Sequence, residues 1–260
     1  MCKKLIEERM RVWVVVTLFL LMTGAVYGDM IWVGYGNLSW GGSLDNWYDA
    51  STGALATYFP TTSINVPMPM PACTIEAGTD AESQILWIAP WVGNPGDLTM
   101  DGGTLTVADY MFVGSQDTGH FTVNDGAINV ANQILIGANP GVLGYMTMNG
   151  GTIDISVQGL YMGGNGVGEL EMTGGTIITP EIGFGVWGDG SGTINFNGGG
   201  QITILGTSQL DDVLYWMGDG EINNAQLNVV SGNLVLTQVP EPVTLALLGI
   251  GSMVLLRRRK

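Results

Sequence analysis

The chain has 260 residues, with 23 Asp and Glu against eight Lys and Arg, and a formal net charge of −15. All eight basic residues lie before residue 12 or after residue 256, so the region between them carries 21 acidic residues and no Lys or Arg. That region has no cation to neutralise phosphates, which excludes nucleic acid as a partner, and its charge favours solubility by self-repulsion.

Residues 1–28 have the pattern of a secretory signal peptide: a basic start, an apolar run and small residues at its end. The pattern predicts export by a Sec-type machinery and cleavage by signal peptidase between Gly28 and Asp29. An uncleaved N-terminal anchor is the alternative, and Met10 is an alternative start. Cys2 leaves with this leader, so Cys73 is the single remaining thiol. We interpret it as a small core residue, with a reactive or intermolecular thiol as the alternative.

Residues 29–72 are rich in aromatic side chains, among them Trp32, Trp40 and Trp47. The open end of a stack of strands needs a cover, because unpaired strand edges invite aggregation. We therefore expect this segment to be an N-terminal cap whose tryptophans pack inward. The alternative is a sugar-stacking surface formed by these tryptophans, with Trp91 further along the chain.

A sequence unit containing Gly-Gly or Asp-Gly recurs at nearly constant spacing. Its second glycine falls at Gly103, Gly126, Gly151, Gly175 and Gly199. A fixed period of this length is typical of a solenoid. Each unit has two runs of alternating apolar residues around the glycine turn and a third run that ends on glycine, as expected for strands. The sequence thus predicts an all-β protein, a parallel β-helix with three short strands per ~24-residue rung and rungs ~4.8 Å apart.

The repeat predicts six or seven rungs within residues 73–238. Residues 229–232 resemble a last rung displaced by extra residues, which we place in a loop at 205–213. The residues before the glycine turn are polar in every unit and predict a structural ladder at one corner of the stack; they are Asp101, Asn124, Asn149, Thr173 and Asn197.

The last 22 residues combine three features: Pro240-Glu241-Pro242, an apolar run at 243–256, and a terminal basic cluster. The run predicts a short membrane helix of about 21 Å, less than the ~30 Å hydrocarbon core, and the cluster would hold its end in the cytoplasm. That cluster is Arg257, Arg258, Arg259 and Lys260. Hydrophobic helices are therefore expected at both ends of the chain.

Residues 239–260 resemble the PEP-CTERM sorting signal, in which these three features occur in this order. The resemblance implies transient membrane anchoring, then recognition and cleavage near Pro240–Pro242 by an exosortase-type membrane protease, with delivery to the cell surface or extracellular matrix. It also implies association with extracellular polysaccharide. More loosely, residues 29–238 resemble the glycine-rich β-strand repeats of autotransporter-like and adhesin-like surface proteins.

Catalysis is not expected. Lyase chemistry on acidic sugars needs basic residues that the body lacks. A glycosidase needs two nearby carboxylates, and Asp211-Asp212 is the one adjacent acidic pair of the body after residue 28. The alternative function it suggests is a polysaccharide hydrolase. His120, the single histidine, is interpreted as a solvated turn residue rather than a base.

No cofactor and no defined metal site are predicted. Loose Ca²⁺ binding is the alternative, because acidic side chains sit near glycine turns, although no calcium-binding motif is present. These residues are Asp109, Asp117, Asp125, Asp189 and Asp219. The leading hypothesis is an exported, non-enzymatic β-solenoid protein; a carbohydrate- or calcium-dependent surface adhesin is the alternative.

Overall fold

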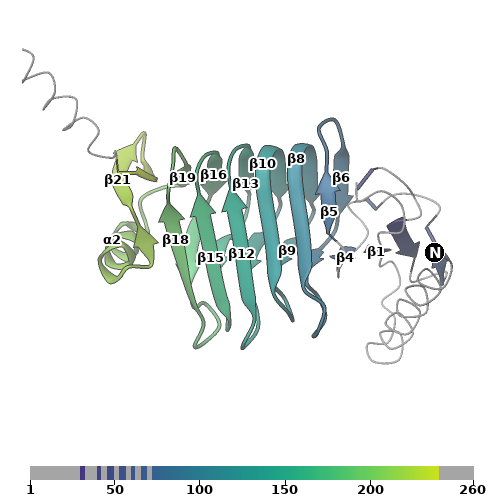
Figure 1. The fold of residues 1–260 in the computed structure, drawn as a ribbon. Helices are drawn as coiled ribbons and strands as arrows, with labels where there is room; N and C mark the ends of the chain where they lie inside the picture. Colours follow the sequence, from purple (N-terminus) through teal and green to yellow (C-terminus); the bar gives the residue numbers. More distant parts are fainter. Residues whose placement is uncertain are drawn as a thin grey trace, which may run out of the picture.

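Two parallel sheets wind along one axis to form a β-solenoid of about six rungs (Figure 1). The computed structural model describes residues 30–32, 40–41, 46–49, 53–56, 60–61, 66–68 and 72–239. The predicted fold class is therefore confirmed. The expected terminal helices, at 1–28 and 243–256, lie outside the described residues.

The large sheet has 13 strands and holds the first two strands of every rung. The first-strand column is β5 (Cys73–Ile75), the start of β8 (Gly96–Val107), the start of β10 (Gly119–Val130), β12 (Leu143–Met148), β15 (Val167–Met172) and β18 (Ser191–Phe196). The second-strand column is β6 (Asp80–Ser83), the ends of β8 and β10, β13 (Thr152–Ile155), β16 (Thr176–Thr179) and β19 (Gln201–Ile204). β8 and β10 run unbroken through the glycine corner, where their mutual register shifts.

The small sheet has six strands and holds the third strand of each rung. In spatial order they are β17 (Glu181–Phe184), β14 (Gly159–Met162), β11 (Gln133–Ile136), β9 (Tyr110–Val113), β7 (Leu86–Ile88) and β4 (Val66–Met68). β4 lies inside the segment predicted as the cap. The first strand of the small sheet thus precedes the predicted start of the solenoid at residue 73.

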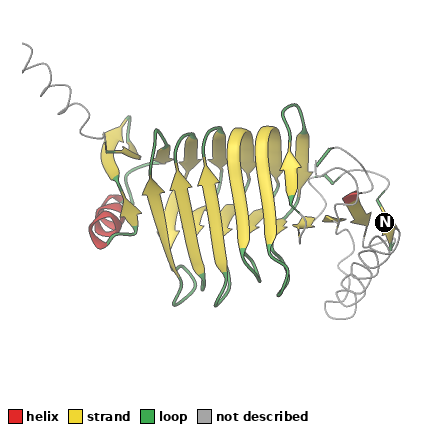
Figure 2. Ribbon diagram, viewed as in Figure 1, coloured by secondary structure: helices red, strands yellow, loops and turns green. Residues whose placement is uncertain are grey.

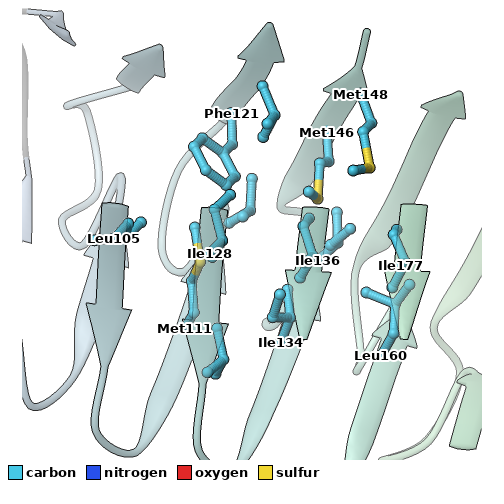
Figure 3. Packing of buried hydrophobic residues seen from close by; sticks show 14 of the residues in the cluster. Leu105, Met111, Phe121, Ile128, Ile134, Ile136, Met146, Met148, Leu160 and Ile177 are labelled. Carbon is cyan, nitrogen blue, oxygen red and sulfur yellow. The ribbon is translucent and has the colours of Figure 1, made fainter. Parts of the chain in front are cut away.

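Equivalent apolar side chains stack in rows between the sheets (Figure 3). One row joins Leu105, Ile128, Ile153, Ile177 and Ile202, paired in register between neighbouring parallel strands. All of these side chains are buried. Each contributes about 1.5–3 kcal/mol to folding by leaving water. Because apolar and polar residues alternate along each strand, every inward-facing strand position forms one such row of apolar side chains along the rod.

A column of glycines marks the beginning of the first strands. Gly96, Gly119, Gly144, Gly168 and Gly192 pair with one another in register. A methyl group at Gly144 would lie 2.2 Å from the carbonyl oxygen of Val113 and 2.4 Å from the amide nitrogen of Gly137. Glycine is required there because two backbone segments approach too closely for any side chain.

The single α-helix of the described chain, α2 (Leu210–Asp219), covers the C-terminal end of the rod (Figure 2). Val213 is fully buried, and the Trp216 ring packs edge-on against Phe184 with centroids 5.1 Å apart. The Gln209 amide accepts from the backbone N–H of Ile182 (2.9 Å) and donates to its C=O (2.8 Å). It thereby replaces a neighbouring strand at the edge of β17.

The prediction of a loop over residues 205–213 was wrong from residue 210 onward. Leu210, Val213 and Met217 fall on one helical face at spacings of three and four residues, and all three pack against the core. An unrepeated segment has no neighbouring copy to extend its strands, so a helix closes the stack instead.

The predicted seventh rung was also wrong. β20 (Ile222–Asn223) starts a further turn, but β21 (Ala225–Val230) and β22 (Asn233–Gln238) form an antiparallel hairpin, and β22 pairs antiparallel with β19. Ser231 and Gly232 make the two-residue turn with φ of 52° and 81°. Two successive positive φ angles are typical of a hairpin turn, which reverses the strand direction and ends the parallel stack.

Candidate functional site

The described part of the body ends at Val239, directly before the Pro-Glu-Pro motif. β22 ends at Gln238, and the N–H of Val239 donates to the carbonyl oxygen of Asn224 at 2.8 Å. The motif residues Pro240, Glu241 and Pro242 lie outside the described residues, as do the basic cluster 257–260 and the predicted cleavage site at Gly28 and Asp29. In the sequence, one residue, Val239, separates the last strand from the motif.

The three N-terminal tryptophans form the inside of the cap. Trp47 packs edge-on against Trp32 (centroids 5.1 Å apart) and Trp40 (4.8 Å apart), and its Nε1 donates to the carbonyl oxygen of Trp40 at 3.2 Å. All three side chains are at most 1% exposed. Trp32 and Trp47 belong to a small antiparallel sheet formed by the cap strands β1 (Met30–Trp32), β2 (Trp47–Asp49) and β3 (Ala54–Leu55). No ring face is open to a sugar, so the sugar-stacking interpretation of these residues is withdrawn.

Other aromatic rings reach the surface. Trp91 is half-buried in the loop after β7, while Trp187 is 53% exposed in the loop after β17. On the outer face of the small sheet, the Trp87 and Phe112 rings of neighbouring rungs stack with centroids 6.2 Å apart. Sequence reasoning missed Trp187 because its exposure depends on a loop that the repeat does not specify.

The candidate carboxylates of a hydrolase lie on the helix. Asp211 and Asp212 are exposed in the first turn of α2, where negative charge stabilises a helix start. His120 is exposed on β10 and stacks on Tyr145 with ring centroids 5.0 Å apart. β12, β15 and β18 lie between β10 and the end that α2 covers, so the structure does not bring His120 together with this acidic pair.

The acidic residues near glycine turns are engaged in local hydrogen bonds. Asp117 accepts the N–H of Gly93 (2.6 Å), Asp125 accepts that of Gly126 (2.8 Å), and Asp109 accepts from the Asn132 side chain (3.0 Å). Within the described part of the chain, no group of three or more His, Cys, Asp or Glu side chains is placed to hold a metal ion. Asp189 and Asp219 belong to no such group either.

The predicted polar ladder forms over four rungs. Asn124 donates to Asp101 (2.7 Å), Asn149 donates to Asn124 (2.8 Å), and the Thr173 hydroxyl donates to Asn149 (2.7 Å). Asn197 leaves the ladder and donates to Glu171. The carboxylate of Asp101 can only accept, so it ends the chain of donors at the N-terminal side.

Cys73 is buried in β5, in register with Leu98, and belongs to the apolar core. Burial raises the pKa of its thiol well above the usual value, which suppresses the reactive thiolate. The structure therefore places the single cysteine of the body as a core residue.

These observations define a class: an acidic β-solenoid without Lys or Arg in its body, closed by a tryptophan cap at one end and by a helix and hairpin at the other. Residues 238–260 match the family model described as the PEP-CTERM protein-sorting motif. No curated protein and no solved structure matches the chain. The signal indicates export and cell-surface association, with an exosortase as the protein that recognises it.

Over the residues that the structure describes, no helix has the length and apolar character to cross a membrane. The apolar run 243–256 lies outside those residues.

Proposed function

We propose that this chain is an exported, non-enzymatic β-solenoid protein that a C-terminal sorting signal delivers to the cell surface or extracellular matrix. Signal peptidase removes residues 1–28, the apolar run 243–256 holds the chain in the membrane for a time, and an exosortase-type protease cuts near Pro240–Pro242. The observation that carries the proposal is the sorting-motif match at 238–260.

The structure of the C-terminal end fits this processing. The last described strand pairing involves Gln238, and the N–H of Val239 donates to Asn224, so the proposed cut lies C-terminal to the described strands of the rod. The acidic body has no cation and would be repelled by an anionic membrane surface, which leaves the basic tail as the segment attracted to it. The rod itself serves as structure, with no cofactor and at most loose Ca²⁺ binding.

Deletion of Pro240–Pro242 tests the proposal. We expect the deleted protein to stay in the membrane fraction of its host, while the unaltered protein is recovered at the surface or in the medium. The matched control is Val92→Ala, an exposed loop change that should leave sorting unaltered; Val92 is 79% exposed. Terminal sequencing of the released protein checks both predicted cleavage sites. Normal release of the deleted protein would contradict the sorting role.

A carbohydrate-dependent adhesin is the second candidate, favoured by the exposed ring of Trp187 rather than by the buried cap tryptophans. The acidic body would disfavour anionic polysaccharides, so a neutral glycan is the expected ligand. Binding on a glycan array should disappear in Trp187→Ala and persist in Val186→Ala, its exposed neighbour. An array that stays blank with and without calcium excludes this candidate.

A further inference from the structure

The outermost strand of the large sheet, β21, has one open side (Figure 1). It pairs with β22 from Ala225↔Gln238 to Val230↔Asn233, and no other strand in the described chain pairs with it. Its sequence, Ala-Gln-Leu-Asn-Val-Val, contains no charge and no proline. Edge strands of soluble proteins are usually protected by charges, prolines or bulges, and β21 has none of these.

The hairpin geometry identifies the backbone groups that face the open side. The Val239 N–H donates to the carbonyl oxygen of Asn224, and the paired residues Val230 and Asn233 flank the two-residue turn. Hydrogen-bonded pairs alternate along an antiparallel ladder, so residues 224, 226, 228 and 230 bond to β22. The N–H and C=O groups of residues 225, 227 and 229 therefore point away from the hairpin.

The apolar rows of the core continue to this open side. Ile202 pairs with Leu236, which pairs with Leu227; the parallel row leads through Leu234 to Val229. Leu234 and Leu236 are fully buried, Leu227 is half-buried and Val229 is 58% exposed. The core thus ends at a strand edge with its apolar row partly uncovered.

We propose that β21 pairs antiparallel with β21 of a second copy of this chain, about a two-fold axis at Leu227, and joins two rods at their C-terminal ends. In this register Leu227 faces its own counterpart, and Ala225 faces Val229 of the second copy. On the other side of the sheet, Gln226 faces Asn228. The open backbone groups of residues 225, 227 and 229 then form about six hydrogen bonds across the axis.

A second copy fits because the strand is complementary to itself, as a two-fold interface requires. Apolar residues meet apolar residues and amides meet amides. Contact through the acidic faces would bury carboxylates that no Lys or Arg of a second body could pair, which is costly. The uncharged edge avoids that cost. Repulsion between the two acidic rods remains, so added salt should strengthen the dimer by screening.

Cysteine cross-linking of the full chain in its host tests the register. Leu227→Cys should form a disulfide-linked species of twice the mass under mild oxidation. The two Cα atoms of such a pair lie about 5.5 Å apart, within the roughly 4.4–6.8 Å range of disulfides. Val229→Cys alone is the matched control, because its own counterpart lies four residues along the strand, about 13 Å away. Cells making both Ala225→Cys and Val229→Cys chains should give the linked species.

Three results would overturn the pairing. The first is a monomeric Leu227→Cys chain, the second is linkage to a species of another mass, and the third is equal linkage of Val229→Cys alone. Linkage of Leu227→Cys should persist when Pro240–Pro242 is deleted, so failure of the sorting proposal can be told apart from failure of this one.

Sedimentation of the processed wild-type protein should give twice the single-chain mass. Added salt should lower the dissociation constant of this dimer. Val229→Lys adds a charge to the edge at an exposed position and should raise the dissociation constant at least tenfold, with an unchanged circular dichroism spectrum. A Val229→Lys protein that dimerises as tightly as the wild type would also refute the pairing.

Discussion

The glycine column predicts that close backbone approach, rather than backbone conformation, sets the cost of a side chain in this rod. Gly144→Ala and Gly141→Ala separate the two effects within one rung. Gly144 has no positive φ, but an added Cβ would meet backbone atoms at 2.2 and 2.4 Å. Gly141 has a φ of +75°, and its added Cβ would meet nothing within 4 Å.

The magnitudes follow from these distances. A forced overlap with backbone costs about 1–3 kcal/mol or more, and the 2.2 Å contact puts Gly144→Ala at the upper end, about 3 kcal/mol. Gly141→Ala pays only for the left-handed conformation, about 1 kcal/mol. In a domain of this size, Tm falls by about 2–4 °C for each kcal/mol of lost stability. Tm should therefore fall by about 6–12 °C in Gly144→Ala and by about 2–4 °C in Gly141→Ala.

Thermal unfolding of the two purified variants, followed by far-ultraviolet circular dichroism, measures the difference in Tm. An equal or larger loss of Tm in Gly141→Ala would refute the reasoning, because positive φ would then outweigh close packing. A Gly144→Ala protein with unaltered Tm would show that the rungs can move apart freely.

Three other changes test the ladder, the partly buried carboxyl of Glu221 and the cap. Asn149→Ala removes two ladder hydrogen bonds and should lower the unfolding free energy by about 1–2 kcal/mol in urea titration, against no change for Val157→Ala, an exposed residue on the same rung. Burial, and then the charge of Asp219, raise the pKa of the Glu221 carboxyl in the folded protein. The folded state therefore binds a proton on this group more tightly than the unfolded state does. The contribution of Glu221 to the unfolding free energy is full below its ordinary pKa and is lost as the pH rises through the raised value. Glu221→Gln should therefore raise Tm at pH 7 and lose that advantage below about pH 4, whereas an equal gain at both pH values would contradict the assignment. Trp47→Ala should cost about 3–5 kcal/mol because it empties the centre of the cap, and a loss under 1 kcal/mol would show that the cap carries no packing energy.

The repeated part of the fold could be predicted because the strands and the turn of each rung are specified by residues within that rung. The alternation at Leu105 and Val107 and the turn at Gly103 recur in the following rungs, and stacking in register requires only that recurrence. The ladder from Asp101 to Thr173 follows from the same register. Asn197 departs from it because Glu171, a longer side chain one rung away, competes for its amide.

The ends of the rod could not be predicted in this way. Val229 to Gly232 carry the apolar and glycine pattern of a rung, but two consecutive positive φ angles at Ser231 and Gly232 reverse the chain. The choice depends on a partner strand, β19, that no local pattern encodes. The burial of Trp32, Trp40 and Trp47 likewise depends on tertiary contacts. The sequence alone therefore could not decide whether these tryptophans pack inside the cap or form a sugar-binding surface.

The charge distribution has a consequence for how the protein can be digested and labelled. Trypsin cuts after Lys or Arg, and the chain offers no such residue between Arg11 and Arg257. Folded or unfolded, the whole body is one tryptic fragment, and reagents that attack lysine find no target along it. The cap residues Trp32, Trp40 and Trp47 are buried, so a protease that prefers aromatic side chains can cut after them only when the cap opens, whereas the exposed Trp187 is accessible in the folded rod. Cleavage after the cap tryptophans, and not digestion by trypsin, therefore reports on the folded state.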